Sequence, residues 1–179
     1  NGDRTLETLR EKYIPEAEVI ARLVLQAGGK LITDADTLKE MIKQMRIQIF
    51  TEELARTEAG NNGSMMLAMH KTEDVIRIPF VEGKAYARNL DEGSRAQVFR
   101  AAIEGQVYFM KWIAEQIGLN VSSIKLTGGV AKNEAIRQIV ADVFNADVNV
   151  LAVDEAVALG SAIRAMKAAE NITWEDAIK

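Results

Sequence analysis

The sequence contains no cysteine and a single histidine, His70, among its 179 residues. Without cysteine the chain can form no disulfide, no thiolate metal site, no cysteine-ligated iron–sulfur cluster and no cysteine nucleophile. One histidine leaves little room for a histidine metal site or a Ser-His-Asp triad. We expect His70 to be a solvated loop residue or a satisfied hydrogen-bonder rather than a catalytic residue. The lack of cysteine also fits a cytoplasmic location.

The chain also lacks an apolar run long enough to span a membrane and a basic stripe that would suit nucleic acid. Its net charge is −4 and its pI is near 5.2. With 48% hydrophobic and 27% charged residues, the composition is that of an ordinary globular domain. The first residues, Asn-Gly-Asp-Arg, resemble neither a signal peptide nor a usual initiator sequence. We therefore expect a piece of a larger protein that binds neither membrane nor nucleic acid.

The first third of the sequence is expected to be helical. Apolar residues recur at helical spacing over residues 5–26, where Pro15 should split the segment into two helices. Asp34 and Asp36 are N-cap candidates for a further helix that reaches Ile49. A short helix over residues 51–58 should follow. We treat residues 1–60 as a helical segment or insertion and residues 61–179 as the main domain.

The middle of the chain should pass from extended segments into one long helix. After the breaker at residues 60–63, extended pieces are expected at 65–69, 75–81 and 84–88. Ser94 opens a capping pattern for a helix that ends near Ile117. Gly105 lies inside that helix at a cost of about 1 kcal/mol relative to alanine, which predicts close approach to a neighbouring backbone.

The last third alternates strand and helix: strand 121–127, helix 133–145, strand 148–151 and helix 154–169. Such alternation predicts parallel strands joined by crossovers. Gly128 and Gly129 fall between the first strand and its helix, where a side-chain-free backbone and a helix N-terminus suit a phosphate. An ordinary turn with glycines for geometry alone is the alternative. In the last long helix we expect Gly160 to serve tight packing rather than nucleotide approach.

Four segments of this region together resemble the C-terminal half of the FGGY carbohydrate kinases. They are Phe99-Arg-Ala-Ala-Ile-Glu-Gly105, Leu126-Thr-Gly-Gly-Val-Ala-Lys-Asn133, Gln138-Ile-Val-Ala-Asp-Val143, and Val148-Asn-Val150 with Glu155-Ala-Val-Ala-Leu-Gly-Ser-Ala162. Asn62-Gly63 is loosely similar to the family's Asn-Gly turn, and Gln26-Ala-Gly-Gly29 only faintly to a stretch of its nucleotide pocket. The resemblance covers about 70 residues well, in the family's order and approximate spacing.

The resemblance implies an actin-like ATPase built of two ribonuclease-H-like halves with ATP and Mg²⁺ in the cleft. Gly128 and Gly129 would face the phosphates and ribose, Val130 would line the same pocket, and Asn133 would approach the adenine. Many family members carry a third glycine where this chain has Val130, although glycerol kinases also carry a bulkier residue there. The family's catalytic aspartate and metal-binding acidic residues have no matching motif here, so we assign no catalytic and no metal-binding residue.

We therefore expect an α/β ribonuclease-H-like half-domain with a mixed sheet and packed helices, plus the N-terminal helical segment. The expected reaction is ATP-dependent phosphorylation of a sugar or polyol, with this chain supplying the nucleotide side. Expected partners are that substrate and the N-terminal half of the same kinase; a homodimer is left open. The alternatives are a non-catalytic nucleotide-binding module and an activator of radical acyl-CoA dehydratases, although such activators need cluster-binding cysteines. A Rossmann dinucleotide site fits less well, because the glycines do not spell G-x-G-x-x-G.

Overall fold

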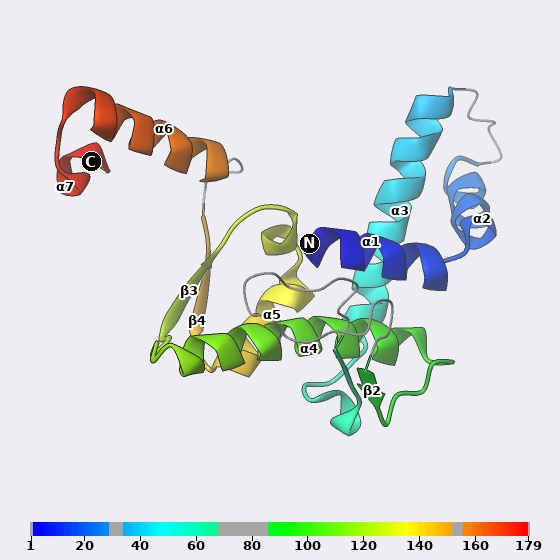
Figure 1. Ribbon diagram of the computed structural model, residues 1–179. Helices are drawn as coiled ribbons and strands as arrows, with labels where there is room; N and C mark the ends of the chain where they lie inside the picture. The colour runs from blue at the N-terminus through cyan, green and yellow to red at the C-terminus, as the bar shows by residue number, and fades with distance from the viewer. Residues whose placement is uncertain (1, 29–33, 68–85, 152–155, 179) are drawn as a thin grey trace. The chain divides into compact units, whose positions relative to one another are not determined.

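The computed structural model describes residues 2–28, 34–67, 86–151 and 156–178 (Figure 1). It divides into two compact units, Asn1–Leu119 and Asn120–Lys179. His70, Gly29 and the extended piece expected at residues 75–81 lie outside the described residues. The division expected after residue 60 stays a prediction; in the structure, the helices on either side of it pack within the first unit.

The described residues of the first unit form four α-helices and a small antiparallel strand pair. The helices are α1 (Gly2–Tyr13), α2 (Glu16–Gln26), α3 (Ala35–Ala55) and α4 (Arg95–Gln116), with a 3₁₀ turn η1 (Asn61–Gly63) and strands β1 (Met65–Leu67) and β2 (Tyr86–Arg88). Aromatic side chains lie at the centre of its core. The centroid of the Phe99 ring lies 4.8 Å from the Phe50 centroid and 6.1 Å from the Tyr13 centroid. Helices α1, α3 and α4 therefore share one apolar interior.

Local sequence signals set most helix boundaries as expected. Pro15, at φ −59°, separates α1 from α2. The Asp34 carboxylate accepts the Thr37 N–H at 2.7 Å and caps α3. The Ser94 hydroxyl accepts the Gln97 N–H at the start of α4 at 3.5 Å. At the other end of α4, Gly118 adopts φ +75° and Leu119 donates to the Ala114 carbonyl at 2.9 Å, which satisfies the last turn.

The separate short helix expected over residues 51–58 is wrong, because α3 runs without interruption to Ala55. Thr51, where the new helix was expected to begin, instead donates its hydroxyl to the Ile47 carbonyl at 2.8 Å inside the helix. Phe50 and Leu54 remain on the buried side. The apolar face of α3 thus continues through the position where a break was expected.

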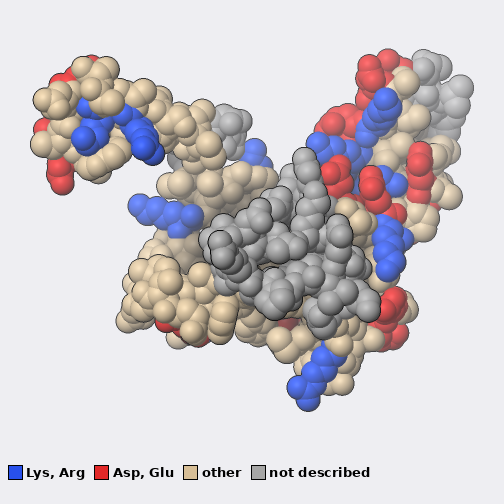
Figure 2. Space-filling view, viewed as in Figure 1, with Lys and Arg blue, Asp and Glu red and all other residues tan. Residues whose placement is uncertain are grey.

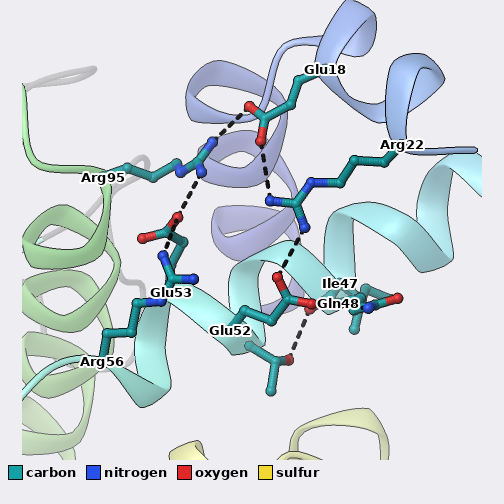
Figure 3. Close-up of polar contacts among 9 residues, drawn as sticks. Glu18, Arg22, Ile47, Gln48, Glu52, Glu53, Arg56 and Arg95 are labelled. Atoms are coloured by element: carbon teal, nitrogen blue, oxygen red, sulfur yellow. Dashed lines mark hydrogen bonds and ion pairs between the residues drawn. The ribbon is translucent and has the colours of Figure 1, made fainter. Parts of the chain in front are cut away.

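Charged side chains join three helices of the first unit (Figure 3). Arg95 of α4 contacts Glu18 of α2 at 2.8 Å and Glu53 of α3 at 2.6 Å. Arg22 of α2 contacts Glu52 of α3 at 2.9 Å. On the face shown in Figure 2, acidic and basic side chains are intermixed over α2 and α3 rather than gathered by sign. These contacts fix how the helices pack and do not form a patch of single charge.

The breaker at residues 60–63 is confirmed as a turn of left-handed backbone. The φ values are +77° at Gly60, +46° at Asn61, +52° at Asn62 and +75° at Gly63. Among the residue types, glycine and asparagine adopt this conformation most readily. Strand β1 follows and pairs antiparallel with β2, with Met65 opposite Arg88. The extended pieces expected at 65–69 and 84–88 are confirmed within residues 65–67 and 86–88.

The second unit contains a parallel strand pair with its crossover helix. Strand β3 (Ser123–Leu126) pairs parallel with β4 (Asp147–Val150), and η2 (Gly129–Lys132) and α5 (Glu134–Phe144) connect them. Helix α5 buries Ile136, Ile139, Val140 and Val143, the face expected from their spacing. The parallel pair and its crossover are therefore confirmed.

Helices α6 (Ala156–Glu170) and α7 (Trp174–Ala177) complete the second unit. Helix α6 packs mainly with α7, where Lys167 lies 5.2 Å from the Trp174 ring centroid. The expectation of tight packing at Gly160 is wrong for the described residues: α6 buries no side chain, and no heavy atom lies within 4 Å of a Cβ built there. The described helices include none with the length and apolarity needed to cross a bilayer.

Candidate functional site: the glycine loop after β3

The loop formed by residues 127–133 begins at the carboxyl end of a parallel strand. Leu126, the last residue of β3, lies opposite Val150, the last residue of β4. Leu151 then donates its N–H to the Leu126 carbonyl at 2.9 Å. Both strands therefore end at the same edge, and the loop leaves from that edge. In parallel α/β sheets, ligands bind outside the carboxyl ends of the strands.

Gly128 and Gly129 form the open part of this loop. Gly128 has φ +76° and ψ −165°, a conformation that a residue with a Cβ adopts only under strain. Among the residues that the structure describes, no heavy atom lies within 4 Å of a Cβ built at either glycine. Both residues are exposed, as is Val130, whose side chain is 37% accessible. A ligand can therefore approach the backbone here without meeting a side chain.

Backbone donors lie at the start of η2. Ala131 donates to the Gly128 carbonyl at 3.1 Å and Asn133 donates to the Val130 carbonyl at 3.2 Å. The N–H groups of Gly129 and Val130 precede the first bond of this turn and meet no acceptor among the described residues. Successive unpaired N–H groups in a turn form a concave site for an anion such as a phosphate oxygen.

Helix α5 holds the other end of the loop. The Asn133 side-chain oxygen accepts the Ile136 N–H at 3.1 Å and caps the helix. Arg137, in the first turn of α5, donates Nη1 to the Ala131 carbonyl at 2.7 Å. Ala131 itself is only 1% exposed. The buried half of the loop is thus fixed to α5, whereas the glycine half is open.

The structure brings Gly128, Gly129, Val130 and Asn133 together in one loop, as their spacing requires. It shows a capping role for the Asn133 oxygen, and the proposed role of this residue at an adenine stays a prediction. Gln26 and Gly28 lie in the first unit, where Gln26 ends α2 and Gly28 has φ +59°. Within the described ranges, no three acidic or histidine side chains are grouped as a metal site would require.

Arg137 is the residue of this loop region that sequence reasoning missed. A signal for it does exist, because a cation in the first turn of a helix opposes the positive end of the helix dipole. Such a residue is expected to have a specific partner, and the Ala131 carbonyl is that partner. Which carbonyl it would reach depends on the geometry of η2, and the sequence does not reveal that geometry.

Comparison with known proteins identifies the region that contains this loop. Residues 84–169 match the model of the FGGY family of carbohydrate kinases, C-terminal domain. The chain is 33% identical over 135 residues to a xylulose kinase of Haemophilus influenzae, which covers 72% of this chain and 27% of the relative. It is 32% identical over 127 residues to a xylulose kinase of Rattus norvegicus, covering 65% of this chain and 22% of the relative.

A glycerol kinase of Nitrosomonas eutropha is 38% identical over 76 residues, which is 40% of this chain and 15% of that protein. The chain thus spans about a quarter of the length of the two xylulose kinases that it matches. The segments Phe99–Gly105 and Leu126–Asn133, whose pattern suggested the family, both fall inside the matched residues. Residues 84–169 are therefore identified with the C-terminal domain of the FGGY family of carbohydrate kinases.

Proposed function

We propose that this chain forms the nucleotide side of a kinase that transfers phosphate from ATP to a hydroxyl of a sugar or polyol. The observation that carries the proposal is the open loop at Gly128 and Gly129, at the carboxyl end of a parallel strand pair, with two N–H groups that meet no acceptor within the described ranges. In this proposal the chain has a ribonuclease-H-like fold and is completed by the N-terminal half of the same kinase.

The loop suits the phosphates of ATP rather than a neutral ligand. The Gly129 and Val130 N–H groups would donate to phosphate oxygens, and the absent side chains would let the backbone come close. Val130, partly exposed beside them, would line the pocket. Asn133 would lie toward the adenine. Its side-chain oxygen accepts the Ile136 N–H in the helix cap, and its amide group would supply the contact with the base.

Phosphoryl transfer of this kind depends on positioning and charge neutralisation and needs no covalent intermediate. Mg²⁺ usually binds through substrate phosphates and one or two carboxylates. In this proposal the ion would arrive on the triphosphate. We place the aspartate that takes the proton of the sugar hydroxyl outside these 179 residues. The chain would therefore bind ATP but would not phosphorylate sugar alone.

Calorimetric titration of the chain with Mg-ATP tests this proposal. We expect the unchanged chain to bind and Gly129→Val to bind at least tenfold more weakly, because the added side chain would occupy the phosphate approach. The fold should survive, since the space around a Cβ at Gly129 is empty. Gly129→Ala is the graded control and should give an intermediate affinity. Equal affinity in all three proteins, or ADP release by the chain alone that depends on sugar, would overturn the proposal.

A further inference from the structure

Arg137 holds the buried half of the glycine loop in place. Its Nη1 donates to the Ala131 carbonyl at 2.7 Å, and its own N–H donates to the Asn133 carbonyl at 3.0 Å within α5. The first bond joins α5 to the middle of η2, and Ala131 lies two residues after Gly129. Arg137 is half-buried and the bond is partly buried, so competition with water is reduced.

The direction of the Gly129 and Val130 N–H groups depends on the shape of η2. Two backbone bonds join this turn to its flanks, from Ala131 to the Gly128 carbonyl and from Asn133 to the Val130 carbonyl. A turn of four residues with few internal bonds has little stability of its own. The charge-assisted bond from Arg137 to the Ala131 carbonyl is stronger than a neutral one. It therefore restrains the turn more firmly than either backbone bond does alone.

We propose that Arg137 is a positioning residue that pre-organises the loop for the phosphates of a nucleotide. It contacts the backbone of the loop and acts on the ligand through it. This inference rests on the proposed function, because the ligand is the one assigned to the glycine loop. Without Arg137, the loop would have to be ordered when the nucleotide binds, and that ordering lowers affinity.

Three variants of the chain test this inference. Arg137→Met removes the donors and keeps a stem of similar length, and Arg137→Lys restores one charged donor. Arg56→Met is the matched control: it also removes one arginine charge, from an exposed side chain of the first unit that contacts Glu53 at 3.6 Å. Affinity for Mg-ATP is measured by calorimetry, and the exchange rates of the amide hydrogens of residues 129–133 by NMR.

We expect Arg137→Met to weaken Mg-ATP binding by roughly tenfold and to speed amide exchange in residues 129–133. Arg137→Lys should recover part of the affinity and part of the slow amide exchange. Arg56→Met should change neither the affinity nor the exchange rates. Normal binding by the unchanged chain together with equal affinity in Arg137→Met would overturn the inference and leave the proposed function standing. If the unchanged chain bound no nucleotide, the proposed function would fall. Unchanged amide exchange in Arg137→Met would then overturn the positioning role as well.

Discussion

The backbone of Gly105 in α4 touches the backbone of Met66 in β1. A Cβ built on Gly105 would lie 1.8 Å from the Met66 carbonyl oxygen and 2.9 Å from its carbonyl carbon. Because both groups are backbone atoms of regular elements, neither can turn aside as a long side chain can. The helix and the strand therefore meet at a distance that only glycine permits.

Gly105→Ala should destabilise the first unit by about 3 kcal/mol, at the upper end of the usual cost of overpacking. The substitution also gains about 1 kcal/mol of helix propensity, but the backbone clash outweighs that gain. Urea unfolding followed by fluorescence of Trp112, in a Trp174→Phe background, reports on this unit, and fluorescence of Trp174 in a Trp112→Phe background reports on the second.

Gly160→Ala is the matched control, because Gly160 is also inside a helix but no heavy atom of the described part of the chain lies within 4 Å of its built Cβ. Here the propensity gain of about 1 kcal/mol should appear without a clash, so the variant should be as stable as the unchanged chain or more so. If the two substitutions had the same effect on stability, the contact between Gly105 and Met66 would be refuted.

A buried ion pair in α4 secures the turn before β1. Arg100 Nε lies 2.6 Å from Glu104 Oε1, and the same oxygen accepts the Gly60 N–H at 3.0 Å. Arg100 and Glu104 are only 6% and 2% exposed. Glu104→Gln would remove the carboxylate that pairs with Arg100 in this buried contact, so we expect a loss of about 3–5 kcal/mol in the free energy of unfolding.

The matched control for this pair is a second ion pair closer to the C-terminal end of α4. Lys111 and Glu115 have the same four-residue spacing and are 3.9 Å apart, but the Glu115 side chain is 57% exposed. Glu115→Gln should cost less than about 1 kcal/mol. A cost for Glu104→Gln as small as that for Glu115→Gln would contradict the structural role of the buried pair.

The stability of the first unit should depend on pH through Glu52. Hydrogen bonds from Arg22, and then from Gln48, lower the pKa of the Glu52 carboxyl below its ordinary value of 4.5. Because the folded state holds this proton less tightly than the unfolded state, the contribution is complete above pH 4.5 and is lost as pH falls through the folded-state pKa. The side chain is partly exposed, so the contribution is small.

Urea unfolding of the unchanged chain and of Glu52→Gln, between pH 7 and pH 3, measures this contribution. The stability difference between the two proteins should be largest near neutral pH and should shrink as the solution becomes acidic. Arg22→Met should remove the same pH-dependent part, because it removes the main cause of the lowered pKa. A difference that grew toward acid pH would have the wrong sign for this account.

Features set by neighbouring residues could be predicted from the sequence. The N-caps at Asp34 and Ser94, the break at Pro15 and the end of α4 at Gly118 each depend on a few adjacent residues. Gly105 is an informative exception, because its cost inside a helix pointed to a contact with a distant backbone. The extent of α3 was misjudged, since Thr51 can cap a helix or bond inside one.

The features that the sequence did not reveal depend on contacts between distant residues. Glu104 bonds the Gly60 N–H across 44 positions, and no local pattern indicates that pairing. Within the site, the residue types and their order predicted the glycine loop. The sequence did not reveal the bond from Arg137 to the Ala131 carbonyl or the capping role of the Asn133 oxygen, because both depend on the path of η2.

The central claim is that nucleotide phosphates contact the backbone at residues 128–130. Titration of the ¹⁵N-labelled chain with Mg-ATP, followed through the amide resonances, tests it most directly. We expect the largest shifts at Gly128, Gly129 and Val130, with the Gly129 and Val130 signals moving in the direction of stronger hydrogen bonding. If Mg-ATP bound while these three resonances stayed in place and the shifts gathered elsewhere, the claim would be contradicted.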